Sequence, residues 1–164
     1  MSSFPFHTIL KNLPTDWNSK KHLWIWNPDK IPPHIGISDG DNYFSLTFRG
    51  IEQLHVPEIL KKANRSKTPF LVIELEQTSF QTDFSQIFNQ FEKAKVNGPT
   101  CLYPIKAICG SSNRVNQLSD LLVEIQQNQQ KWTVYGAHLP LGYSEIPAYS
   151  VADIMIRIDE LGRE

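Results

Sequence analysis

The chain has 164 residues, 40% of them apolar and 20% charged, which is typical of a single soluble globular domain. Its 17 acidic and 16 basic side chains give a net charge of −1, so we expect no nucleic-acid partner, which would require clustered Lys and Arg. We also expect no transmembrane segment and no secretory signal, because the apolar runs are short. Two cysteines do not make a disulfide framework, so we expect a cytoplasmic protein with free thiols.

The first half of the sequence is rich in strand-forming residues. Residues 1–20 are polar with scattered aromatic side chains, and we interpret them as an N-terminal arm of one domain spanning 1–164. Strands are predicted at 22–28 (HLWIWNP), 34–38 (HIGIS), 42–50 (NYFSLTFRG) and 68–76 (TPFLVIELE). The DGDN turn, with Gly40, predicts a hairpin between the second and third of these. The nearly continuous apolar run of the fourth indicates a strand buried on both faces.

Helical signals dominate the second half. A first helix is predicted at 55–65, with Pro57 in its first turn. Asp83 is expected to cap a helix with the apolar stripe Phe84, Ile87, Phe88 and Phe91, and a further stripe comprises Leu118, Leu121, Leu122 and Ile125. Ser150 with Asp153 opens a last helix that carries Ile154, Ile158 and Leu161. A strand is predicted at 132–136 and a loop at 138–147. The pattern predicts an α+β fold, with a small, mainly antiparallel sheet and several helices packed against it.

Most signatures of chemistry are missing from the sequence. It has no glycine-rich phosphate loop, no Cys-x-x-Cys and no Gly-x-Ser-x-Gly. Its five histidines include no pair at i, i+4 spacing, so neither a metal site nor a cofactor is expected. A thiol and an imidazole remain as candidate reactive groups.

Cys101 is the candidate nucleophile. It follows a Gly-Pro-Thr break and precedes an apolar segment, so a helix starting at Thr100 would favour the thiolate through its N-terminal N–H groups. Pro104 suggests the alternative that the helix starts there and leaves Cys101 in the preceding loop. The competing interpretation is a small buried apolar residue, which we expect for Cys109.

The segment HLWIWNPDKIPPHIGISDGDNYFSL resembles the opening of the lecithin–retinol acyltransferase-like proteins, relatives of the circularly permuted papain-like amidases. In those proteins a strand His is followed by a Gly-Asp turn and a hairpin partner, and the catalytic Cys lies further along, at the start of a helix. His34, Gly40, Asp41 and Tyr43 match that pattern, and Cys101 matches the position of the nucleophile in chain order. The resemblance implies a thiol acyltransferase, amidase or peptidase acting on a peptide, amide or acyl substrate, with His34 as general base and then acid.

The sequence departs from the family pattern at its third polar residue. Leu46 occupies that position, and the neighbouring Ser45 is the candidate orienting residue, although an ideal strand would direct it to the opposite face. His138 is a competing base. Trp24 and Trp26 share a strand face and, with Tyr43, are candidates to line a substrate groove, unless they pack against a helix. The alternative function is a non-catalytic module that binds a protein partner.

Overall fold

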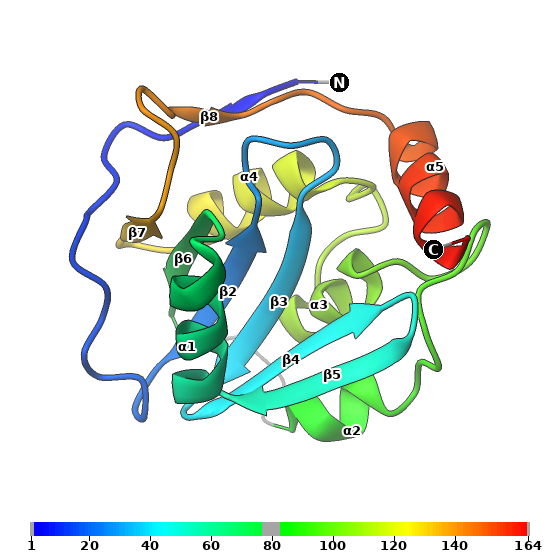
Figure 1. The fold of residues 1–164 in the computed structure, drawn as a ribbon, viewed down its shortest axis with the longest axis horizontal. Helices are drawn as coiled ribbons and strands as arrows, with labels where there is room; N and C mark the ends of the chain where they lie inside the picture. The colour runs from blue at the N-terminus through cyan, green and yellow to red at the C-terminus, as the bar shows by residue number, and fades with distance from the viewer. Residues whose placement is uncertain (1, 77–82, 164) are drawn as a thin grey trace.

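The computed structural model describes residues 2–76 and 83–163, which form an α+β domain built on a six-stranded antiparallel sheet (Figure 1). The sheet has the strand order β5-β4-β3-β2-β6-β7. Its strands are β2 (Lys21–Trp26), β3 (His34–Asp39), β4 (Asn42–Thr47), β5 (Gly50–His55), β6 (Phe70–Leu75) and β7 (Val134–Ala137). The helices are α1 (Val56–Ser66), α2 (Phe84–Phe88), α3 (Leu102–Cys109), α4 (Leu118–Asn128) and α5 (Val151–Gly162). The predicted fold class is confirmed.

The predicted hairpin forms, but the strand after it is shorter than expected. Gly40 adopts a positive φ of 59° in the turn between β3 and β4, a conformation that glycine accepts without strain. The strand predicted at 42–50 is wrong at its end, because a second turn at residues 48–49 reverses the chain just before Gly50, which has a φ of 135°. The chain then pairs back along β4 as β5, which the sequence analysis did not predict, and runs directly into α1.

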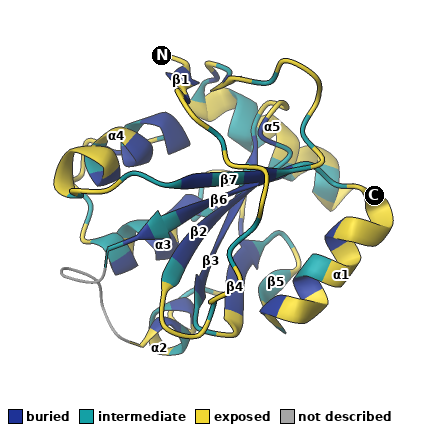
Figure 2. Ribbon diagram, turned by 90° about the vertical axis from the view of Figure 1, so that its left-hand side faces the viewer, coloured by how far each residue is buried: buried dark blue, intermediate teal, exposed yellow. Residues whose placement is uncertain are grey.

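The two faces of the sheet carry separate clusters of buried side chains (Figure 2). The face covered by α1, here called the α1 face, buries Trp24, Tyr43, Phe70 and Val72 against Val56, Ile59 and Ala63. The opposite face, here called the α3 face, packs against α2, α3 and α4 and contributes Ile35, Ile37, Phe44, Leu46, Leu71 and Ile73. Strand β6 supplies residues to both clusters, as its continuous apolar run predicted.

Side-chain caps fix the first residues of two helices, α2 and α5. The Asp83 side chain accepts a hydrogen bond of 3.0 Å from the Gln86 N–H and caps α2, as predicted. The helix ends at Phe88, however, so Phe91 lies beyond it and the predicted stripe is too long. Ser150 and Asp153 form the predicted capping box at the start of α5.

The N-terminal arm is tied to the segment that precedes α5. Strand β1 (Phe4–Pro5) pairs with β8 (Glu145–Ile146), and the Phe6 N–H donates to the Ser144 carbonyl at 2.8 Å. Phe4 and Phe6 are buried. The predicted arm therefore packs on the domain, and the loop predicted at 138–147 contains a short strand.

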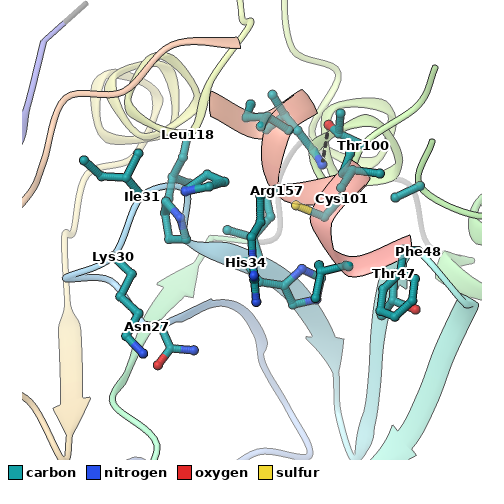
Figure 3. A pocket seen from close by; sticks show the side chains of 18 of the residues that line it. Asn27, Lys30, Ile31, His34, Thr47, Phe48, Thr100, Cys101, Leu118 and Arg157 are labelled. Carbon is teal, nitrogen blue, oxygen red and sulfur yellow. Dashed lines mark hydrogen bonds between the residues drawn. The ribbon is translucent and has the colours of Figure 1, made fainter. Parts of the chain in front are cut away.

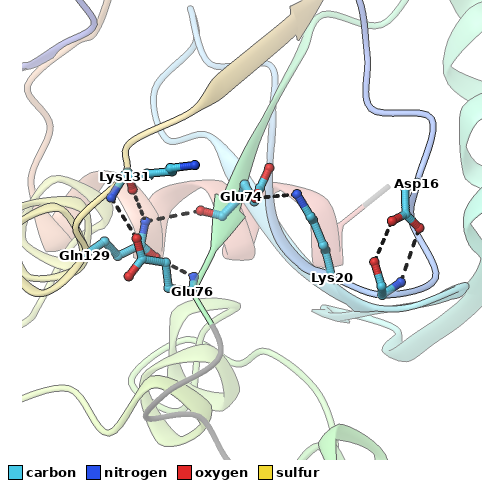
Figure 4. Close-up of polar contacts among 7 residues, drawn as sticks. Asp16, Lys20, Glu74, Glu76, Gln129 and Lys131 are labelled. Carbon is cyan, nitrogen blue, oxygen red and sulfur yellow. Dashed lines mark hydrogen bonds and ion pairs between the residues drawn. The ribbon is translucent and has the colours of Figure 1, made fainter.

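The chain between α4 and β7 is held by polar contacts at the end of β6 (Figure 4). The Gln129 side chain accepts from the Glu76 N–H at 3.0 Å and donates to the Glu74 carbonyl at 3.2 Å. The Glu76 carboxylate accepts from the Lys131 N–H at 2.7 Å. These contacts fix where the chain leaves α4 and turns into the edge strand β7. Among the described residues, no helix has the length and hydropathy to cross a membrane.

Candidate functional site

Helix α3 places Cys101 beside the sheet. The helix begins at Leu102, midway between the predicted starts at Thr100 and near Pro104, and Cys101 is its N-cap residue rather than part of the preceding loop. Pro104 fits in the first turn because N–H groups there have no partner within the helix. Buried side chains, including Ile105 and Ile108, pack α3 against the α3 face of the sheet.

Strands β3 and β4 diverge toward the start of β3 (Figure 1). They pair from Ile37↔Phe44 to Asp39↔Asn42, whereas β3 stays paired with β2 as far as Trp26↔His34. At the unpaired end, the Cys101 sulfur lies close enough to the backbone of Ile35, the residue after His34, for that backbone to favour the thiolate. Two residues separated by 101 − 34 = 67 positions in the chain thus lie at the same end of β3.

A pocket of about 820 Å³ lies over this opening, and both Cys101 and His34 line it (Figure 3). Its walls are mostly apolar and include Ile35, Leu46, Phe48, Leu102, Leu118 and Ile158. Lys30 and Arg157 bring positive charge to the pocket, and Asp29 and Glu160 bring negative charge. A partly apolar ligand with a polar group near Cys101 would match this lining.

Burial keeps both candidate reactive groups neutral. It raises the pKa of the Cys101 thiol to about 11, although the nearby Ile35 backbone acts in the opposite direction. It lowers the pKa of the His34 imidazole to about 4. No hydrogen bond joins the sulfur to the imidazole within the described part of the chain. The resting site therefore holds a thiol and a neutral imidazole, which is the protonation state of a general base, rather than an ion pair.

Leu46, which stands where the family pattern has its third polar residue, has apolar surroundings in the structure. Leu46 is fully buried and lines the pocket. Ser45, the candidate orienting residue, is also fully buried, but it follows Tyr43 by two residues and so faces the α1 side of the sheet. It is absent from the pocket lining, so its orienting role stays a prediction without support from the pocket geometry.

The aromatic groove predicted from Trp24, Trp26 and Tyr43 is wrong. Trp24 and Tyr43 have no exposed surface, and both pack under α1, the alternative that the sequence left open. Trp26 donates its indole N–H to the Tyr43 hydroxyl at 2.8 Å. Alternation along β2 correctly grouped the two tryptophans, but Trp24 is fully buried and Trp26 is partly buried beside the same cluster.

The remaining candidates lie away from the pocket or in the core. The His138 imidazole lies 2.9 Å from the Asn64 side chain on α1 and does not line the pocket, so it is not placed to act on Cys101. Cys109 packs against the α3-face core, and burial raises its pKa to about 12. Arg157 and Tyr149 line the pocket but were not candidates, since no local motif marks a residue that reaches a site from α5 or the loop before it.

No group of three or more His, Cys, Asp or Glu side chains is placed to hold a metal ion in the described part of the chain. No family model, curated protein or solved structure matches the sequence or the fold.

Proposed function

We propose that the pocket carries out cysteine-dependent acyl transfer or hydrolysis, with Cys101 as nucleophile and His34 as general base. The observation that supports the proposal is the position of the Cys101 sulfur against the backbone of Ile35, next to His34, in a pocket that both residues line. The N-cap position of Cys101 adds the N–H groups of the first turn of α3, which favour negative charge.

In the proposed reaction, His34 takes the thiol proton as the sulfur attacks the carbonyl carbon of an ester, thioester or amide. The carbon–sulfur bond forms, the bond to the leaving group breaks, and the leaving group receives the proton from His34. Water or an acceptor nucleophile then displaces the thiol, which recovers its proton. A cytoplasmic location, which would keep the thiol reduced, stays a prediction.

The test is the formation of an acyl-enzyme from activated esters. With p-nitrophenyl acetate and butyrate as probes, we expect a burst of p-nitrophenol and a mass increase on the peptide that contains Cys101. Cys101→Ala should abolish both signals, and the matched control Cys109→Ala should keep them. His34→Gln should slow acylation by about 10²- to 10⁴-fold, the usual contribution of a general base. His138→Gln is its control and should acylate at the normal rate.

A non-catalytic binding pocket is the second candidate function. The raised pKa of the Cys101 thiol and the apolar Leu46 at the third position favour it, since neither activates a nucleophile. If the wild-type protein forms no acyl-enzyme, or if His34→Gln acylates as fast as wild type, the catalytic proposal fails. Ligand binding that survives Cys101→Ala would then support the binding module.

A further inference from the structure

Helix α5 forms one wall of the pocket. Ile154, Arg157, Ile158, Glu160 and Leu161 all line it. In Figure 3, Arg157 extends from α5 into the pocket toward His34. Anything that enters between α5 and the sheet to reach Cys101 would pass these side chains.

The attachment of α5 to the domain is weak along its length. The helix has no buried residue, whereas α4, which also lines the pocket, buries Leu118, Leu121, Leu122 and Ile125 (Figure 2). Its ion pairs, Arg157–Glu160 at 3.5 Å and Arg163–Asp159 at 2.6 Å, lie within the helix itself. Among the residues that the structure describes, the hydrogen bond that joins α5 to another segment runs from the Asn97 N–H to the Met155 sulfur, a weak acceptor, at 3.0 Å.

The start of α5, by contrast, is fixed. Tyr149 is 5% exposed, and its hydroxyl accepts a hydrogen bond of 2.9 Å from the Leu118 N–H at the start of α4. The Ser150–Asp153 capping box satisfies the first N–H groups of α5 without help from the rest of the domain. The helix is therefore complete in itself, joined to a firm anchor at one end, and lightly held beyond it.

We propose that α5 is a hinged cover of the pocket, which turns about Tyr149 and controls access to Cys101. The biological purpose of the cover rests on the proposed function, because it would admit the substrate and then shield the acyl-enzyme from water. Ile154 and Ile158 hold the cover closed, since both are partly buried against the α3-face core. Ile156, on the same helix, is 57% exposed and makes no such contact with the core.

The experiment measures how fast fluorescein maleimide, a bulky thiol reagent, labels Cys101 in the full chain. Mass spectrometry separates the labelling of Cys101 from that of Cys109. In the double variant Ile154→Ala/Ile158→Ala, Cys101 should label at least about tenfold faster, because the closed state loses two partly buried side chains. The matched control Ile156→Ala should label at the wild-type rate, and Cys109 should stay slow in every variant.

Two results would overturn the cover. In one, the double variant labels Cys101 no faster than Ile156→Ala does. In the other, the labelling rate of Cys109 rises by the same factor as that of Cys101, which means that the whole domain has become less stable. If the double variant does not fold, Ser150→Ala replaces it, and we expect about fivefold faster labelling from the loss of the N-cap. Ser66→Ala, at the exposed end of α1, is its control.

This result is independent of the acylation test. Maleimide reacts with any accessible thiolate and does not need His34. A cover that opens as proposed, in a protein that forms no acyl-enzyme, would separate the failure of the catalytic proposal from the behaviour of α5. The reverse combination, an acyl-enzyme whose Cys101 labels independently of α5, would reject only the cover.

Discussion

The two faces of the sheet are both lined by apolar side chains, but among the described residues only the α3 face borders the pocket that contains Cys101. On the α1 face, Trp24 stacks between Trp17 and Trp26, with ring centroids 5.1 and 5.6 Å apart, and the cluster is closed. On the α3 face, the separation of β3 from β4 interrupts the packing and leaves a pocket with a thiol in it. The comparison shows that one sheet can carry a tightly packed aromatic cluster on one face and, on the face with the larger buried cluster, a pocket beside Cys101.

The largest expected effect is a loss of stability when the α1 face is opened. Trp24→Ala should lower the free energy of unfolding by about 3–5 kcal/mol, because a large, fully buried side chain leaves a cavity. Ile31→Ala, at the 51% exposed rim of the pocket, should change it by less than about 0.5 kcal/mol. Urea denaturation followed by circular dichroism measures both. Similar losses for the two variants would break the comparison.

The next effect tests how completely the α1 face excludes water. His22 is fully buried near Trp17, neither ring nitrogen has a hydrogen-bond partner in the structure, and burial lowers its pKa from 6.5 to about 4. Between those pH values the unfolded chain binds a proton that the folded chain does not, so stability is full above pH 6.5 and falls as the pH drops toward 4. From pH 7.5 to 5, His22 should account for a loss of about 2 kcal/mol.

The variant His22→Phe should remove that part of the pH dependence. It should also cost little stability at pH 7.5, because it eliminates two buried nitrogens that lack partners. Urea denaturation at the two pH values provides the measurement. An unchanged pH dependence in His22→Phe would mean that water reaches the imidazole and that the α1 face is less closed than the packing indicates.

The last prediction concerns Gly36, which lies on the α1 face of β3 and pairs with Trp24. A Cβ atom there would overlap the Tyr43 ring and hydroxyl. Gly36→Ala should therefore lower the free energy of unfolding by about 1–3 kcal/mol, the cost of overpacking. In a Tyr43→Leu background the same substitution should cost less, because the shorter side chain leaves room for the methyl group. Equal costs in both backgrounds would show that Tyr43 does not press against β3.

Local signals in the sequence were sufficient for much of the fold. The Asp83 and Ser150 caps and the Gly40 turn depend on neighbouring residues, so they could be predicted from short windows. Strand β5 and the β1–β8 pair were missed because each depends on a partner that the strand meets only after folding. The stripe through Phe91 was too long because apolar spacing continues past the point where the helix ends.

The site was predictable only in part. Cys101 was selected from its position after a Gly-Pro-Thr break, and a family resemblance added His34. The structure brings both to one pocket, but their catalytic roles stay a prediction. Alternation along β2 and β4 showed which side chains share a face, yet it could not show that α1 would cover Trp24 and Ser45. Arg157 reaches the pocket from the far end of the sequence, and no spacing rule relates that position to His34.

The pairing of β1 with β8 connects the opposite ends of the chain. Phe4 lies across from Ile146, only a few residues before the anchor at Tyr149. A substitution or extension next to Phe4 therefore acts on the segment that leads into the proposed hinge of α5 at Tyr149. If α5 turns about Tyr149 as proposed, a fusion partner attached upstream of Phe4 should change the rate at which maleimide labels Cys101, and labelling of tagged and untagged protein tests this.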